Sequence, residues 1–303
     1  MPRPCPVTKE QADEIVARYV AGETPMKLSK EYGTSERWVT LELDRRGVQR
    51  RGREVCKANI RHDAFADAEN DPAAAYWVGF LMADGCVTQR PDSNSFQVVL
   101  VLAEKDAAHV QKLADFVGSK NKILDVSKIH SGVRKWYKRF AISSKEVATD
   151  LARYGILPRK SLTAKVEVLE DNPHFWRGMI DGDGSLMIHT SYGGTQSPQA
   201  SLIGSLDCVT QFCQFVNTRT DSSIKPRKAG KVFDALVTGW AAYNLIRILY
   251  GSCDETTSLN RKREKADHIL QNVVPKSVRR KPGTDRCPEP VRGQLTFADF
   301  GVI

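Results

Sequence analysis

The sequence predicts an α+β protein with two similar halves behind a small all-helical domain, and three observations lead to this prediction. A nine-residue pattern occurs twice, as WVGFLMADG at residues 77–85 and as WRGMIDGDG at residues 176–184. The same order of helical and strand patterns follows each copy, and the first 48 residues show only short helical patterns. We therefore expect five parts: a helical domain at 1–48, a linker at 49–70, two repeated halves at 71–170 and 171–274, and a tail at 275–303.

The charge balance favours a polyanionic partner. Lysine and arginine number 45 against 36 for aspartate and glutamate, a formal net charge of +9, and such an excess is common in nucleic-acid-binding proteins. No stretch approaches the roughly 18 apolar residues of a membrane span, and the start MPRPCPVTKEQ has no apolar signal segment. We expect no membrane partner and a cytoplasmic, nucleoid-associated protein of a prokaryote or phage. Seven cysteines without a Cys-x-x-Cys pair argue against a disulfide framework and a zinc ribbon.

The domain at 1–48 contains three short amphipathic helical patterns. Thr24 as N-cap and Pro25 at the first helical position begin the second pattern, Gly33 ends it, and Ser35 begins the third. Two short helices joined by a glycine-containing turn are typical of a helix-turn-helix, whose later helix lies in the major groove of DNA. A three-helix protein-docking module is the alternative. The candidate DNA contacts on the third pattern are Arg37, Thr40, Arg45 and Arg46.

The segments around the halves show no regular pattern. Residues 49–70 open with a basic cluster, which suggests a linker that follows phosphates or is simply solvated. The tail at 275–303 begins with a stretch rich in proline and arginine, which is not expected to form a packed element.

Each half is predicted as helix, two strands, helix, two strands, helix. After the first motif we expect strands at 86–91 and 95–104, a helix at 106–118, strands at 121–129 and 134–143, and a helix at 144–156. After the second we expect strands at 185–191 and 198–205, a helix at 206–217, strands at 222–229 and 231–239, and a helix at 241–251. A basic element ends each half, PRKS with Lys160 and LNRKRE with Lys262.

Small residues four apart mark one face of each motif helix. Two helices packed through such faces can bring their backbones unusually close. The terminal acids Asp84 and Asp183, 99 residues apart, would then approach each other. Carboxylates about 4 to 6 Å apart repel, and a hard divalent cation such as Mg²⁺ removes the conflict. The expected interface residues are Gly79, Ala83, Gly178 and Gly182.

The paired motif resembles that of the single-chain LAGLIDADG homing endonucleases, whose nine-letter helix ends in Asp-Ala-Asp-Gly. The first copy keeps the last acid, Asp84, and has Met82 in place of the first acid, whereas the second copy keeps both, Asp181 and Asp183. In this family the last acid of each motif binds metal, so the resemblance implies that Asp84 and Asp183 are catalytic metal ligands. The resemblance covers roughly residues 71–274.

The resemblance also implies an activity. Lys160 and Lys262 match positions where the family has a basic residue that polarises the attacking water or stabilises the transition state. A surface lysine is the alternative for each, and Arg261 and Arg263 are adjacent candidates. The implied reaction is site-specific, double-strand hydrolysis of DNA with Mg²⁺ or Mn²⁺, in which each acid serves one strand. The implied protein is a monomer with internal pseudo-twofold symmetry that serves homing of a mobile element such as an intron.

The strands would form a saddle of two antiparallel sheets that suits duplex DNA. Alternation along a strand sends one set of side chains to the core and the other to the groove. The polar candidates for the groove face are Gln89, Arg90, Gln97, Lys128, His130, Arg134, Lys138, His189, Gln199, Lys225 and Arg227.

A protein that binds nucleic acid without cutting it is the alternative function. Related LAGLIDADG domains occur in transcription regulators fused to helix-turn-helix modules and in maturases that assist the splicing of intron RNA. Retention of the paired aspartates and lysines favours catalysis. An intein is disfavoured because the chain lacks a nucleophilic first residue and a His-Asn ending, and six scattered histidines give no support for a His-Asn-His nuclease.

Overall fold

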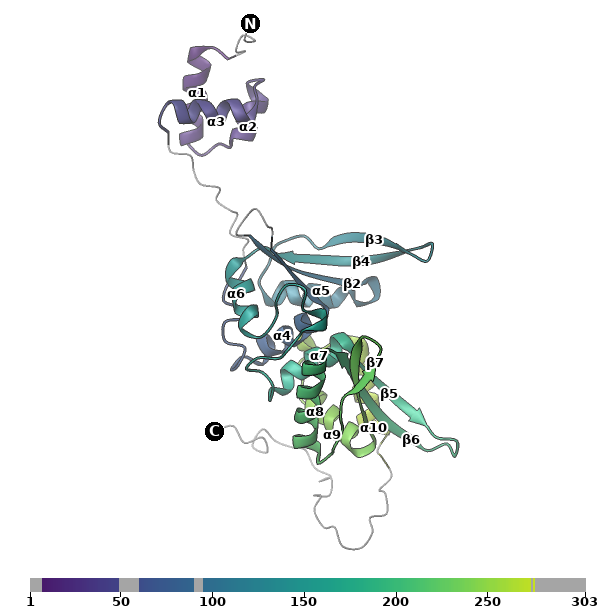
Figure 1. The fold of residues 1–303 in the computed structure, drawn as a ribbon. Coiled ribbons are helices and arrows are strands. Elements are labelled where there is room, and N and C mark those ends of the chain that lie inside the picture. Colours follow the sequence, from purple (N-terminus) through teal and green to yellow (C-terminus); the bar gives the residue numbers. More distant parts are fainter. Residues whose placement is uncertain (1–6, 49–59, 90–94, 274, 276–303) are drawn as a thin grey trace. The chain divides into compact units, whose positions relative to one another are not determined.

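The computed structural model describes residues 7–48, 60–89, 95–273 and 275. The chain forms two compact units, Met1–Ile60 and Arg61–Ile303 (Figure 1). The second unit contains both repeated halves, which we call the first half (71–170) and the second half (171–274).

The first unit contains three short helices where the sequence predicts them: α1 (Lys9–Val20), α2 (Pro25–Glu31) and α3 (Glu36–Arg45). Each begins at a hydroxyl N-cap that accepts a backbone N–H from the first turn. Their apolar faces meet in a small core of Ile15, Tyr19, Leu28, Val39 and Leu43.

The second unit repeats one pattern of helices and strands. The first half contains α4 (Pro72–Asp84), β1 (Gly85–Gln89), β2 (Phe96–Ala103), η1 (Glu104–Asp106), α5 (Ala107–Phe116), β3 (Leu124–His130), β4 (Val133–Ile142), α6 (Lys145–Arg153) and η2 (Lys160–Leu162). The second half contains α7 (Pro173–Asp183), β5 (Gly184–Thr190), β6 (Gln196–Gly204), α8 (Leu206–Thr220), β7 (Arg227–Ala229), β8 (Val232–Thr238), α9 (Gly239–Tyr250), η3 (Glu255–Thr257) and α10 (Asn260–Asn272).

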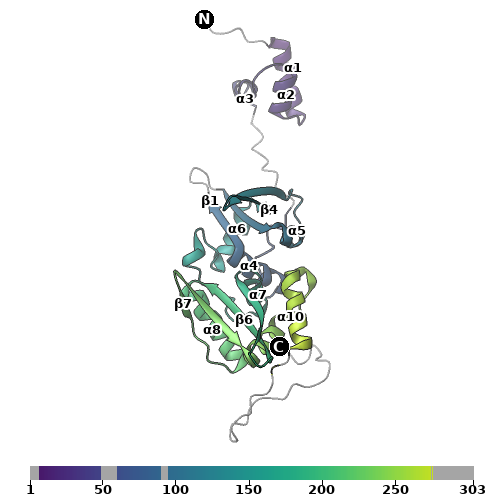
Figure 2. The same cartoon turned by 90° about the vertical axis from the view of Figure 1, so that its right-hand side faces the viewer.

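Each half has one four-stranded antiparallel sheet, ordered β1-β2-β4-β3 in the first half and β5-β6-β8-β7 in the second. Helices cover one face of each sheet (Figures 1 and 2). Val98 and Leu100 of β2, and Ala200 and Leu202 of β6, are buried on that face. We call the opposite face the open face. The predicted α+β fold with two sheet-bearing halves is confirmed.

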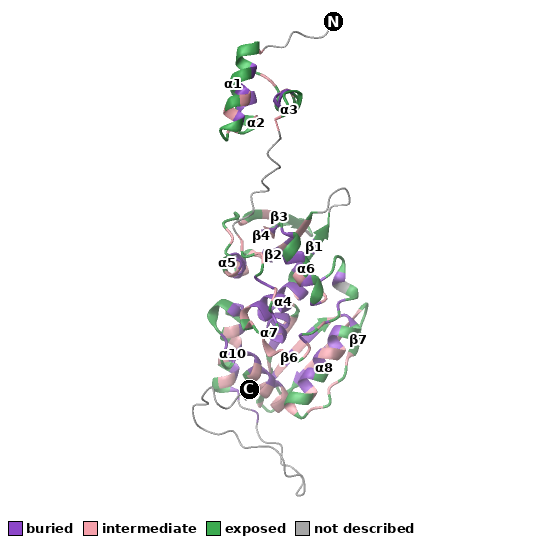
Figure 3. Cartoon of the chain, turned by 90° about the vertical axis from the view of Figure 1, so that its left-hand side faces the viewer, coloured by how far each residue is buried: buried purple, intermediate pink, exposed green. Residues whose placement is uncertain are grey.

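The motif helices α4 and α7 form the centre of the second unit. Both begin at a side chain that accepts two backbone N–H groups, Asp71 and Asn172, followed by proline at the first helical position. Figure 3 shows both helices as largely buried. A Cβ on Gly79 would lie 2.0 Å from the carbonyl oxygen of Phe175, and one on Gly178 would lie 2.1 Å from that of Tyr76. Only glycine allows so close a contact between the two backbones.

Three segments differ from the sequence-based expectation. Residues 61–70, expected to be linker, belong to the second unit, because Ala64, Phe65 and Ala68 are buried there. The strand expected at 222–229 is limited to Arg227–Ala229, so Lys225 lies outside it. The basic element around Lys262 is the first turn of the 13-residue helix α10, which was not predicted. Residues 49–59 and 276–303 lie outside the described residues.

Candidate functional site

The motif acids Asp84 and Asp183 are the last residues of α4 and α7, and both are exposed. Each is followed by a glycine at which the chain turns from helix into strand. A Cβ on Gly85 would lie 2.5 Å from the carbonyl oxygen of Leu81, so no larger residue fits this turn without a shift. A Cβ on Gly182 would lie 3.4 Å from Oδ2 of Asp84. The carboxylate of Asp84 is therefore beside the residue that precedes Asp183.

Both acids have raised pKa values, so their ionised forms are disfavoured at this site. The pKa of Asp84 is raised from 3.8 to about 6, first because surrounding protein atoms displace its water and then because Asp183 repels its charge. Desolvation also raises the pKa of Asp183. Lys160 and Lys262 oppose both shifts. The site is thus a pair of acids whose ionised form is favoured by added positive charge.

The lysines predicted to assist the acids are buried rather than on the surface, with exposed fractions of 7% for Lys160 and 6% for Lys262. Lys160 Nζ donates to the carbonyl oxygen of Gly85 at 2.7 Å. Lys262 Nζ donates to the carbonyl oxygens of Ile180, Asp181 and Gly184 at 2.5, 2.7 and 2.8 Å. Both ammonium groups therefore neutralise carbonyls at the ends of the motif helices, where the helix dipole is negative.

Burial lowers the pKa of both lysines, to about 8 for Lys262. The nearby carboxylates oppose this effect, led by Asp183 for Lys160 and by Asp181 for Lys262. Lys160, from the first half, thus lies in the field of the second-half acid. The sequence-predicted set of two acids and two lysines is brought together at the junction of the halves.

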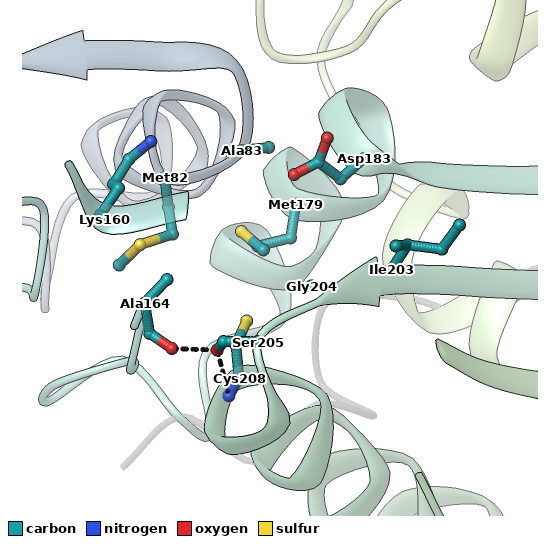
Figure 4. Close-up of a pocket in the computed structure, with 10 residues that line it drawn as sticks. All are labelled: Met82, Ala83, Lys160, Ala164, Met179, Asp183, Ile203, Gly204, Ser205 and Cys208. Carbon is teal, nitrogen blue, oxygen red and sulfur yellow. Dashed lines mark hydrogen bonds between the residues drawn. The ribbon is translucent and has the colours of Figure 1, made fainter. Parts of the chain in front are cut away.

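A cavity of about 210 Å³ adjoins this set. Lys160 and Asp183 line it from different halves, and the thioethers of Met82 and Met179 line it from the two motif helices (Figure 4). Cys208, at the start of α8, completes its apolar wall, and burial raises the pKa of that thiol to about 12.

The first acid position of the motif has a different role from the last. Asp181 is 1% exposed and accepts hydrogen bonds from Tyr250 Oη at 2.6 Å, Tyr76 Oη at 2.8 Å and the backbone N–H of Leu259 at 2.7 Å. Met82, at the matching position of the first half, is also buried. Neither residue is part of the exposed acid pair.

The register of the first sheet divides the predicted groove residues between its two faces. Gln97 and Lys128 lie on the open face. Gln89 shares the helix-covered face with buried Val87. Arg134 and Lys138 share that face with buried Phe140, and Lys138 pairs there with Asp125. The groove-face prediction for Gln89, Arg134 and Lys138 is therefore wrong, because side chains alternate at every residue of a strand and polarity alone does not fix the face.

Two basic residues on the open face of the first sheet were missed. Phe140 and Ile142 of β4 are buried on the helix-covered face. Side chains alternate along the strand, so Lys135 and Arg139 lie on the open face. Arg139 donates to Oε1 of Gln97 at 2.9 Å. The alternation in RKWYKRFAI would have identified both residues. Arg90 and the side chain of His130 lie outside the described residues.

In the second sheet, the residues predicted to face the groove lie on the open face more often than in the first sheet. His189 and Gln199 lie on the open face, opposite the buried alternation of Leu186 and Ala200. Arg227 also lies there, but its guanidinium pairs with Asp234 at 2.5 Å. Lys225 is exposed and precedes β7.

The candidate DNA contacts on α3 differ in whether their side chains already bond within the protein. Arg37 is exposed, whereas the hydroxyl of Thr40 donates to the carbonyl oxygen of Glu36 at 2.8 Å. Arg45 and Arg46 both pair with Glu42, at 2.6 and 2.8 Å.

The described part of the chain has neither a cluster of three metal-binding side chains nor a membrane-spanning helix. Across the described residues, no three histidine, cysteine, aspartate or glutamate side chains gather as a metal-binding group. Within the same ranges, no helix has the length and apolar character needed to cross a membrane.

Comparison with known proteins identifies the fold. No protein-family model and no curated protein matches the sequence. The structure is similar to the homing endonuclease I-WcaI bound to its DNA recognition sequence, with a TM-score of 0.51 and 10% identity over 73% of this chain and 96% of that chain. The LAGLIDADG meganuclease I-AabMI bound to uncleaved DNA also matches, with a TM-score of 0.43 and 15% identity over 66% of this chain and 89% of that chain. The second unit, with one four-stranded sheet in each half, therefore shares its fold with the homing endonuclease I-WcaI.

Proposed function

We propose that this protein is a metal-dependent, site-specific endonuclease that cuts both strands of duplex DNA. The observation that carries the proposal is the pair Asp84 and Asp183, which end two crossing helices side by side, exposed, with two buried lysines next to them. The protein of similar fold, I-WcaI, is a homing endonuclease bound to DNA, which supports the same substrate here.

The acid pair fits a hard divalent cation. Its donors are carboxylate oxygens from both halves, and Asp183 disfavours the charge of Asp84, a repulsion that a shared cation relieves. Since no third acidic or imidazole ligand joins them among the described residues, the remaining positions suit water and phosphate oxygen. Mg²⁺ prefers such a sparse oxygen set. When bound there, Mg²⁺ or Mn²⁺ supplies activation of water and stabilisation of charge on the phosphate.

The chain's own groups complete the chemistry. Asp84 and Asp183 hold the cation, and each serves one strand of the duplex. Lys262 has three protons, all engaged by carbonyl oxygens, so it acts through its charge. Lys160 donates one hydrogen bond to the carbonyl oxygen of Gly85, which leaves N–H donors for water or for a phosphate oxygen. Both ammonium groups stabilise negative charge that develops during hydrolysis.

The open faces of the two sheets form the DNA-binding surface. Lys128, Lys135 and Arg139 on the first sheet contact phosphates or base edges, with His189 and Gln199 on the second. The first unit acts as a tethered helix-turn-helix that adds affinity through effective concentration, with α3 in the major groove. A single chain supplies both halves of the site, so the active species is a monomer.

A library of duplex target sites tests the proposal. Incubation with Mg²⁺, followed by sequencing of the ends, should give one preferred site with breaks in both strands. D84N and D183N should each abolish double-strand cleavage and retain DNA binding, because Asn keeps the shape and removes the charge. Undiminished double-strand cleavage by both variants would falsify the assignment. Binding of DNA without cleavage identifies a regulator, and preference for intron RNA identifies a maturase.

A further inference from the structure

Asp181 connects the two halves through a single buried carboxylate. Oδ2 accepts from Tyr76 Oη of the first half and from the backbone N–H of Leu259, while Oδ1 accepts from Tyr250 Oη. Desolvation raises the pKa of Asp181, and all three donors oppose that effect by favouring the charged form. The three hydrogen bonds are the compensation that a buried carboxylate requires.

The Leu259 contact lies at the start of the helix that carries Lys262. Leu259 is the N-cap residue of α10, and its apolar side chain makes no capping hydrogen bond to the first turn of the helix. In a capping box, a side chain three residues into the helix accepts the N–H of the N-cap residue. Here that position is Lys262, which cannot accept, and Asp181 accepts instead from a neighbouring helix. Its negative charge also suits the positive end of the α10 dipole.

Asp181 contacts Lys262 directly as well. Its carbonyl oxygen accepts from Lys262 Nζ at 2.7 Å, beside the bond from the same nitrogen to Ile180. One residue therefore fixes the first turn of α10 through its side chain and the ammonium group through its backbone. Lys262 has only limited freedom once both contacts are made.

Among its described residues, the first half has no equivalent of the Asp181 side-chain contacts. Met82 occupies the matching position and its thioether accepts hydrogen bonds only weakly. Lys160 belongs to the short helix η2, which follows Arg159 at a φ of 63°. Both lysines donate to the carbonyl oxygen of a motif glycine, Gly85 or Gly184, but only Lys262 also donates to Ile180 and Asp181.

We infer that Asp181 is the positioning residue for Lys262, and that the two strands of a DNA target depend on it unequally. This inference rests on the proposed nuclease function. Loss of Asp181 displaces Lys262 and slows the strand that Lys262 serves, while the strand that depends on Lys160 is spared. A misplacement of about 1 Å can cost on the order of 100-fold in rate, so a nicked intermediate accumulates.

Single-turnover cleavage of a target labelled differently on each strand tests this inference. D181L removes the acceptor at similar volume, D181N keeps one acceptor oxygen, and M82L is the matched change in the first half. D181L should slow one strand by at least about tenfold relative to the other, D181N should slow the same strand less, and M82L should slow neither. K262A should slow that same strand, and D181L combined with K262A should be no slower than K262A alone.

Hydrogen exchange of the same variants separates this inference from the nuclease proposal. D181L should speed exchange of the amides at the start of α10, residues 259–263, and leave those after Lys160 unchanged. If D181L does not fold, D181N and Y250F are compared instead. Y250F keeps the hydrogen bond from Leu259 to Asp181, so faster exchange is expected for D181N only. Equal slowing of both strands, additive effects of D181L and K262A, or unchanged exchange would overturn the inference. If the native protein cuts no DNA, the nuclease proposal fails and hydrogen exchange still decides whether Asp181 orders α10.

Discussion

The methyl group of Ala83 faces Gly182 across the motif helices, where an added Cβ would lie only 2.3 Å away. G182A should therefore force the ends of α4 and α7 apart, since overpacking of this kind costs about 1–3 kcal/mol. Both cleavage activity and the melting temperature should fall. G193A is the matched control, because a Cβ there meets nothing within 4 Å. An unchanged cleavage rate for G182A would show that the acids do not depend on this close contact.

Buried His109 should make the fold sensitive to acid. Burial lowers its pKa from 6.5 to about 3, and its Nδ1 is without a hydrogen-bond partner among the described residues. Below pH 6.5 the unfolded chain takes up a proton at this residue and the folded chain does not. The free energy of unfolding should therefore fall as the pH drops from about 6.5 to 3, by no more than about 1.4 kcal/mol per pH unit from this group.

Urea titrations of the native protein and of H109Q at several pH values measure this contribution. The stability of H109Q should depend less steeply on pH in that window. Parallel pH profiles for the two proteins would show that His109 is not the responsible group.

The two open sheet faces differ in charge, which predicts an unequal dependence of DNA binding on salt. Among the described strand residues, the open face of the first sheet carries Lys128, Lys135 and Arg139 and no acid, whereas Arg227 of the second is paired with Asp234. Removal of one cation that neutralises a phosphate should reduce the slope of log K against log salt by about 0.9. K128A, K135A and R139A should show this reduction, and R227A should show less. Binding titrations at several salt concentrations measure it, and a larger effect for R227A would contradict the asymmetry.

The first unit should increase the affinity for DNA without determining the position of cleavage. Deletion of residues 1–60, which form their own compact unit, should weaken DNA binding and leave the cleavage position unchanged. R37A should weaken binding of the full chain more than R45A, because Arg45 is already paired with Glu42. Mobility-shift titrations and end mapping provide the two measurements. A shifted cut site after deletion would mean that the first unit takes part in target selection.

The sequence was sufficient to predict the repeat, because periodicity and caps are local signals. The motif helices, both sheets and the acid pair all follow from the two copies that end in Asp84 and Asp183. Helix α10 was not predicted because its apolar positions are sparse: only Ala266, Ile269 and Leu270 are apolar in a helix that begins with Asn-Arg-Lys-Arg.

The hydrogen bonds between side chains of distant segments could not be predicted. Tyr76 and Asp181 lie 105 residues apart, and nothing in either segment indicates the hydrogen bond between them. The burial of Lys160 and Lys262 depends on where η2 and α10 pack, which is a property of the assembled halves. Face assignments failed for Gln89, Arg134 and Lys138 because polarity is a weaker guide to strand parity than buried neighbours.

The bond between Tyr76 and Asp181 also makes the two halves non-interchangeable. Two copies of the first half would set Tyr76 against Met82, which weakly accepts at best. Two copies of the second half would set Asp181 against Phe175, which has no hydroxyl to donate. Only the mixed pairing adds this third donor to the two that Tyr250 and Leu259 supply, so the buried carboxylate requires one half of each kind.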